Sequence, residues 1–196
     1  MYLTPSFFIT MEKFEPGSPQ EKKDNGFMTE LLALAHSDQD ARKHWQETGE
    51  TWEKTLDKRN TERLKEIVAK IGWPTQSKVG EEAANAAWLL VQHADHDPEF
   101  QQQCLDLMQH EPDWEVRKQD KAFLEDRVRV STGRPTLYGT QFDYNETGEF
   151  APLPIEDEGN LNRRREAMGL GLFEEYELEM QELNQKIAER TDRNKN

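Results

Sequence analysis

The chain is short of the residues and motifs that define several familiar classes of site. It has one cysteine in 196 residues, so no disulfide can form within it and no cysteine-based zinc site can be assembled. Cys104 lies in FQQQCLDLM, where the apolar pattern predicts a small buried residue and not a nucleophile. Phosphate-binding glycine loops, dinucleotide fingerprints and serine elbows are also missing from the sequence. No motif therefore assigns a reaction.

Long apolar runs and net positive charge are absent as well. No stretch approaches a membrane span, and the N-terminus lacks the basic start and apolar run of a secretory signal. The formal net charge is -14, which repels nucleic acid and anionic membranes and favours cationic ligands or basic protein surfaces. We therefore expect a cytoplasmic protein whose partner is a small molecule, a peptide or another protein, and neither nucleic acid nor membrane.

The composition predicts a modest core inside a charged shell. Charged residues make up 33% of the chain and hydrophobic ones 34%, and the aromatic residues include 5 Trp and 9 Phe as large apolar anchors. This length suffices for one domain with a core of its own. We expect a flexible N-terminal arm over residues 1–26, a single helical domain over residues 27–180, and a charged helix end or tail over residues 181–196.

Helical periodicity begins at Phe27 and dominates the chain. The segment SKVGEEAANAAWLLVQHAD, residues 77–95, is apolar on nearly every face, which predicts a central helix whose alanines let neighbouring helices approach closely. After it, Asp97-Pro98-Glu99 has the N-cap, first-turn proline and first-turn acid of a further helix.

The periodicity changes in the last third of the chain. VRVS, residues 128–131, and YGTQFDY, residues 138–144, alternate like strands, and NETG before EFAPLPI predicts a hairpin turn. The helical pattern then returns, with a break at Gly169-Leu170-Gly171. The predicted fold class is therefore mainly α, a helical bundle-like domain with a small β hairpin near residues 136–155 in the C-terminal third.

A series of polar motifs carries a resemblance to a known family. They are Asp38-Gln39 with Arg42, Trp73-Pro74 with Val79-Gly80, Gln92-His93-Ala94-Asp95, Leu124 with Asp126-Arg127, Tyr138-Gly139-Thr140-Gln141, and Arg165 before Gly169-Leu170. In this order, over roughly Leu31 to Tyr176, the chain resembles an uncharacterised bacterial family of unknown function. Asn162 departs from the pattern, which favours Asp there. The resemblance implies a shared fold and a shared set of polar residues, and it brings no established activity.

His93, at the end of the most apolar helix, is the first candidate for chemistry. A neutral histidine there can act as a general base, or it can be a core residue that ties the helix end to a neighbouring carbonyl. The run HADHD also suggests a metal site, but His93 and His96 are spaced i, i+3, whereas helical histidine ligands usually stand at i, i+4. Asp97 is already needed as a cap, so we expect no metal.

Asp126 and Arg127 follow two apolar residues on a helix, so at least one charge there is expected to be partly buried and in need of a partner. In one interpretation the partner is a charge on another helix, in a salt-bridge network that fixes helix packing; Asp38 and Arg42 can form such a pair at i, i+4. In the other, the partner of the arginine is the anionic group of a ligand.

The segment from Tyr138 to Gln141 adds hydrogen-bonding groups around one turn. As a strand it would place Tyr138 and Thr140 on one face, with Gly139 leaving room for a close approach and Gln141 offering both donor and acceptor. These groups either staple the hairpin to the helices or form the rim of a pocket floored by the central helix, to which Arg165 is added from a late helix.

The sequence favours two functions from different classes. In the first, the chain is a hydrolase or group transferase acting on a small anionic or peptidic substrate, without metal or cofactor. In the second, it is a noncatalytic binding protein whose acidic surface engages a basic partner. A polar pocket containing His93 with Arg127 or Arg165 favours the first, and internal pairing of all these groups favours the second. The predicted site has His93 and Asp126 as catalytic residues and Arg127, Tyr138, Gln141 and Arg165 as substrate-binding residues.

Overall fold

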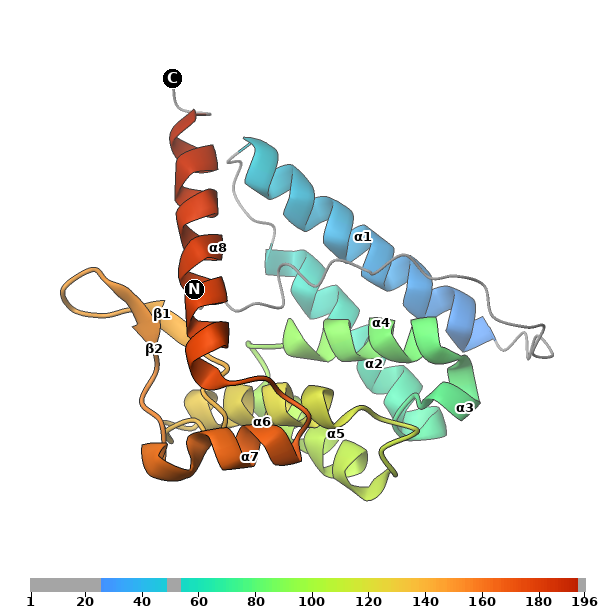
Figure 1. Cartoon of the computed structure of the whole chain (residues 1–196). Coiled ribbons are helices and arrows are strands. Elements are labelled where there is room, and N and C mark those ends of the chain that lie inside the picture. Colours follow the sequence, from blue (N-terminus) through green and yellow to red (C-terminus); the bar gives the residue numbers. More distant parts are fainter. Residues whose placement is uncertain (1–25, 49–53, 194–196) are drawn as a thin grey trace, which may run out of the picture.

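The computed structural model describes residues 26–48 and 54–193 (Figure 1). The predicted N-terminal arm, residues 1–26, lies outside the described residues except for Gly26. The elements in chain order are α1 (Gly26–Thr48), α2 (Lys54–Ile71), α3 (Gln76–Val79), α4 (Glu81–Gln92), α5 (Pro98–His110), α6 (Lys118–Ser131), β1 (Phe142–Tyr144), β2 (Phe150–Pro152), the 3-10 turn η2 (Glu158–Asn160), α7 (Leu161–Ala167) and α8 (Phe173–Arg193). The fold is mainly helical with one antiparallel hairpin, which confirms the predicted fold class.

Helix α4 is the centre of the core, as the sequence predicts. It packs against α1, α2, α3, α5 and α6 (Figure 1). Ala83 and Ala87 are fully buried, so the small side chains bring the neighbouring helices close. No helix among the described residues is long and apolar enough to cross a membrane.

Local signals set several helix ends where the sequence predicts them. The side chain of Asp97 accepts a hydrogen bond from the backbone N–H of Phe100 at 3.1 Å, and Pro98 is the first residue of α5. These two features confirm the predicted cap, since an N-cap acid satisfies a free N–H and proline needs none at this position. The predicted break at residues 169–171 also appears, between α7 and α8.

The hairpin lies beside α8, on one flank of the helical body (Figure 1). Its strands are antiparallel, with Phe142 opposite Pro152 and Tyr144 opposite Phe150. The rings of Phe142 and Phe150 stack with their centroids 5.6 Å apart, so one face of the hairpin is held by aromatic contact. The hairpin falls inside the predicted range of residues 136–155.

One predicted strand is wrong, because VRVS forms the last turn of α6. Val128 is buried, and its carbonyl oxygen accepts a hydrogen bond from Thr132 Oγ1 at 2.9 Å, which stabilises the helix end. Over so short a segment, two valines spaced by two residues fit the period of a strand and that of a helix equally well. Here the preceding helix continues through them.

The other predicted strand is shorter than expected, because it begins only at Phe142. Residues 138–141 form an irregular turn in which Gly139 has a φ of 63°. The two-face pattern predicted for this stretch therefore does not exist. The backbone turns instead because its N–H groups bind a buried carboxylate, described below.

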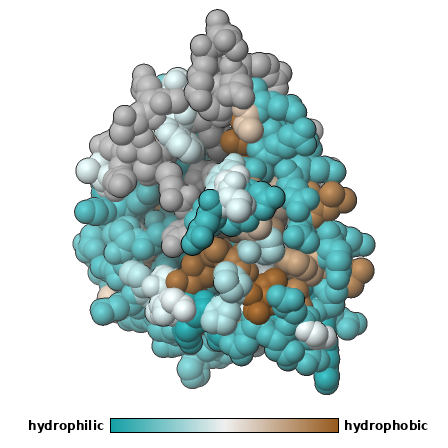
Figure 2. Space-filling view, turned by 90° about the vertical axis from the view of Figure 1, so that its left-hand side faces the viewer, coloured by the Kyte–Doolittle hydropathy of each residue, from teal (hydrophilic) through white to brown (hydrophobic). Residues whose placement is uncertain are grey.

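Helix α8 runs without interruption through residue 180, where we expected the domain to end. Its lower half packs on β2 and α7, and its upper half rises away from them (Figure 1). The face that includes this region is mostly hydrophilic around a central band of hydrophobic surface (Figure 2). The large hydrophobic side chains that are exposed among the described residues are Trp114, Tyr144, Leu172 and Leu178.

Candidate functional site

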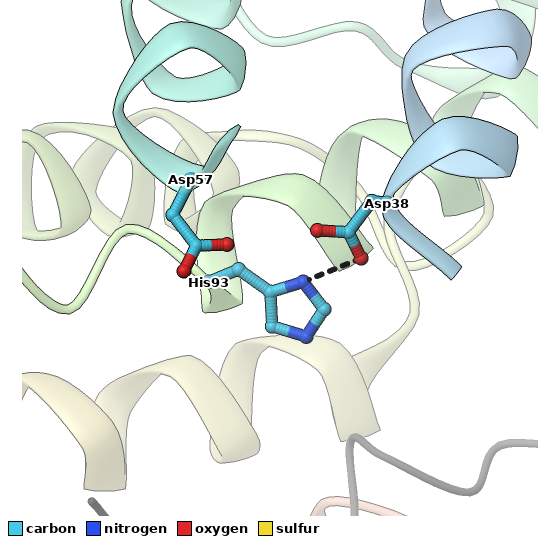
Figure 3. Close-up of side chains that lie close together, drawn as sticks. All are labelled: Asp38, Asp57 and His93. Carbon is cyan, nitrogen blue, oxygen red and sulfur yellow. Dashed lines mark ion pairs between the residues drawn. The ribbon is translucent and has the colours of Figure 1, made fainter. Parts of the chain in front are cut away.

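A buried carboxylate and a buried imidazole meet where α1 crosses the end of α4. Asp38 Oδ2 lies 2.9 Å from His93 Nδ1 (Figure 3). Asp38 is fully buried and His93 is 8% exposed. Leu31, Ala35 and Asp38 form one buried stripe of α1, so the aspartate occupies a position where the helical period calls for an apolar residue.

Arg42 binds the carboxylate of Asp38 and so holds this pair in place. Its Nε donates to Asp38 Oδ2 at 3.0 Å, and its Nη2 donates to Asp38 Oδ1 at 3.2 Å and to Asp57 Oδ1 at 2.6 Å. Asp57 lies in the first turn of α2, so the cluster joins three helices. Figure 3 shows Asp38 and Asp57 reaching toward His93 from α1 and α2. We call Asp38, Arg42, Asp57 and His93 the His93 cluster.

The electrostatics of the cluster keep His93 neutral and Asp38 ionised. Burial lowers the pKa of His93, because the imidazolium is poorly solvated there; Asp38 opposes this and the charges of Arg42 and Arg127 add to it. Burial alone would raise the pKa of Asp38, but the interactions with His93 and Arg42 outweigh it and lower that pKa to about 2. A neutral His93 carries its proton on one ring nitrogen and can accept a proton at the other.

Arg127 lies close enough to this cluster for its charge to act on His93. It is buried, and its Nη1 donates to Asp95 Oδ1 at 2.7 Å. Asp95 itself is half exposed, and the same oxygen also accepts from Gln101 Nε2 at 3.3 Å. Asp95 thus connects the buried guanidinium to the surface of the molecule.

Asp126 faces a different part of the molecule. Its fully buried carboxylate accepts from the backbone N–H groups of Leu137, Tyr138 and Thr140 and from Thr140 Oγ1, at distances of 2.6–3.1 Å. Burial raises the pKa of Asp126, and these same hydrogen bonds oppose the shift. The oxygens are occupied in shaping residues 137–140, which we call the Asp126 loop. Their catalytic use remains a prediction that these contacts do not favour.

Arg165 clamps the same loop from the other side. Its Nη1 donates to the carbonyl of Tyr138 at 2.6 Å, its Nε donates to the carbonyl of Gly171 at 2.8 Å, and its guanidinium lies 4.8 Å from the ring centre of Tyr176. Gln141 donates to its neighbour Thr140 through Nε2 at 3.1 Å.

The structure thus brings the predicted site residues together in two sets. His93 and Arg127 form one, while Asp126, Tyr138 and Arg165 converge on the Asp126 loop, with Gln141 at its end. From the sequence, Asp38 and Arg42 were identified as part of a family motif and as a possible salt bridge, whereas Asp57 was not identified. Charges at core positions of the first helix are the signal that identifies Asp38 and Arg42, whereas Asp57 shows no such pattern.

The His93 cluster also offers donor atoms for a metal ion. One donor atom each from Asp38, Asp57 and His93 lie within 4.8 Å of one another. Arg42 already bridges the two carboxylates, so a cation must displace a well-bonded guanidinium. The arrangement therefore favours an Asp–His pair anchored by arginine over a metal centre.

Comparisons with known proteins give a family but no function. Neither the curated proteins nor the solved structures include a match to the chain. A family model matches residues 25–186, a span that contains the His93 cluster, Arg127 and the Asp126 loop. The chain belongs to the family of unknown function DUF6624, which confirms the resemblance to an uncharacterised family.

Proposed function

We propose that the chain is a hydrolase or group transferase in which His93 is the general base and Asp38 orients it. The observation that carries the proposal is the 2.9 Å approach of His93 Nδ1 to Asp38 Oδ2 in a buried setting that keeps the imidazole neutral. A histidine base with a neighbouring carboxylate that orients it is a known arrangement for general-base catalysis.

The proposed chemistry moves one proton. His93 Nε2 accepts it from water or from a substrate hydroxyl, and that oxygen attacks an electrophilic centre of the substrate. Asp38 stabilises the imidazolium that forms, and Arg42 keeps Asp38 ionised and in place. The imidazolium then returns the proton to the leaving group, which restores the neutral base.

Arg127 supplies the proposed contact with substrate. A carboxylate or phosphate of the substrate replaces Asp95 at the buried guanidinium, where charge-assisted hydrogen bonds are strong. The proposed substrate is therefore small or peptidic and carries an anionic group. The net charge of -14 and the single cysteine support an intracellular setting without nucleic acid or membrane.

The experiment is an activity screen with two variants. Chromogenic esters, amides and phosphoesters are offered to the wild type, to His93→Gln and to His96→Gln, whose residue is exposed and lies on the same segment. We expect turnover in the wild type and in His96→Gln and its loss in His93→Gln. Equal turnover by both variants, or no turnover of any compound, would contradict the proposal.

The second candidate is a noncatalytic binding protein, and the internal pairing of Asp126 and Arg165 supports it. Both side chains form hydrogen bonds with the backbone of the Asp126 loop, as expected of residues with a structural role. This candidate predicts that a basic peptide raises the melting temperature of the wild type and of His93→Gln equally.

A further inference from the structure

A small cavity lies beside the middle of α4, outside the His93 cluster and the Asp126 loop. Two tryptophans, Trp73 and Trp88, form part of its lining, and they are 2% and 4% exposed. The cavity is open to solvent and has room for one group of about the size of a water molecule. Its occupant is therefore very small, or it is the end of a longer group that enters from solvent.

Glu115 brings a buried negative charge to this cavity. The residue is 6% exposed, and its Oε2 accepts from the backbone N–H of Ser77 at 2.9 Å. Burial alone would raise the pKa of Glu115, but hydrogen bonds from Ser77 and Thr75, together with the charge of Lys78, outweigh it and lower that pKa. Lys78 itself pairs with Glu111 at 3.7 Å, and Glu115 forms no ion pair with any described residue. A buried carboxylate is thus kept ionised without a bound counter-ion, which is uncommon.

The lining already holds one cation, the guanidinium of Arg117. It lies 5.8 Å from the ring centre of Trp88 and donates two hydrogen bonds to Asp120, at 2.9 Å and 3.0 Å. Trp88 therefore presents a ring face to positive charge. Arg117 and Asp120 neutralise each other, so the charge of Glu115 is the one that the lining leaves uncompensated.

Two carboxamides in the lining have unused acceptors. Gln76 of α3 and Asn85 of α4 are partly buried, and neither side chain forms a hydrogen bond within the described part of the chain. Their carbonyl oxygens and the carboxylate of Glu115 offer acceptors to a group that donates. A primary ammonium fits this surface, because it has three N–H donors, no acceptor, a positive charge and about the size of water.

We infer that this cavity binds a primary ammonium group at the end of an alkyl chain, as in a lysine side chain or a small amine. An anion is repelled by Glu115 and by the net charge of -14. A hydroxyl matches the space but leaves the charge of Glu115 uncompensated, and a trimethylammonium is larger than the space. No residue of the His93 cluster lines the cavity, so the inference does not rest on the proposed function.

Three matched probes test the inference by NMR titration. The indole N–H signals of Trp73 and Trp88 report occupancy, and the probes are n-butylammonium, n-butanol and butyltrimethylammonium. We expect n-butylammonium to shift both signals to saturation and to bind at least about tenfold more tightly than n-butanol, as one charge-assisted hydrogen bond would give. Butyltrimethylammonium should leave both signals in place.

Three variants locate the binding. Glu115→Gln keeps an acceptor for the N–H of Ser77 but removes the charge, so it should weaken n-butylammonium binding by at least about tenfold. Glu82→Gln removes an exposed charge of α4 outside the lining and should bind like the wild type. Ala84→Leu fills the cavity while Glu115 stays in place, and it should abolish the shift. Ala84→Val serves the same purpose if leucine prevents folding.

Each outcome bears on the inference. No saturable shift with n-butylammonium means that the cavity holds water only, and it overturns the inference. Equal weakening by Glu82→Gln overturns it too, since the general surface charge then attracts the amine, as does a shift that survives in Ala84→Leu. N-acetyl-lysine methylamide identifies the source of the ammonium. Binding like that of n-butylammonium assigns a lysine of a peptide or protein, and binding of n-butylammonium alone assigns a free amine; both support the site.

Discussion

Removing the carboxylate of Asp38 should change how stability depends on pH. The pKa of Asp38 falls from its ordinary value of 3.8 to about 2 in the folded protein. Because the folded pKa is the lower one, the stabilisation is complete above about pH 4 and is lost as the pH falls toward 2. The shift is equivalent to about 2–3 kcal/mol, because the fully buried carboxylate of Asp38 is not screened by solvent.

Urea unfolding measures this contribution in the wild type and in Asp38→Asn at a series of pH values between neutral and about 2. Tryptophan fluorescence is the signal. At neutral pH the variant should be less stable by about 3–5 kcal/mol, because Arg42 and His93 lose their buried partner. That deficit should shrink by about 2–3 kcal/mol at the acid end, where the wild type also loses its charge at this position.

A control on the same helix keeps other acidic groups out of the comparison. Asp40 is exposed and pairs only with His36 among the described residues, at 3.1 Å. Asp40→Asn should therefore follow the wild-type curve, since exposed pairs contribute little. If the curves of Asp38→Asn and the wild type run parallel across the whole pH range, the carboxylate is not the ionised partner of His93, and the proposed orientation of the base fails.

Three further substitutions test the packing around the site. Ala87→Leu should destabilise the protein by roughly 1–3 kcal/mol in urea melts, because it overfills the fully buried face of α4; an unchanged midpoint would mean that this face has room. Gly139→Ala should lower the melting temperature, since its Cβ would lie 2.6 Å from a ring carbon of Phe173 and its φ of 63° is strained for alanine. Arg165→Gln should lower the free energy of unfolding by about 1–3 kcal/mol by leaving the carbonyl of Tyr138 unpaired, and a variant as stable as the wild type would support the prediction that Arg165 binds substrate.

The sequence predicts best those features that depend on neighbouring residues. The central position of α4 follows from its apolar faces, and the start of α5 follows from Asp97 and Pro98. The hairpin follows from its turn and alternation. The short run VRVS was misassigned because a four-residue window cannot separate the two periods when a helix already precedes it.

Features that depend on contacts between distant residues could not be predicted from local sequence patterns. The Asp126 loop exists because a carboxylate of α6 binds N–H groups 11–14 residues later, which no local pattern encodes. The approach of Asp57 to His93 depends on how α2 crosses α4, and it follows from packing of whole helices. The residue types of the site were thus visible, but their division into two sets was not.

Asp126 and Arg127 are consecutive residues of α6, and they serve the two sets separately. Their side chains diverge by about 100° around the helix axis, so one binds the Asp126 loop and the other binds Asp95 beside His93. Any roll of α6 about its axis therefore moves both contacts at once. The Asp126 loop and the surroundings of His93 are linked through a single turn of one helix, so a substitution that turns α6 disturbs both sets together.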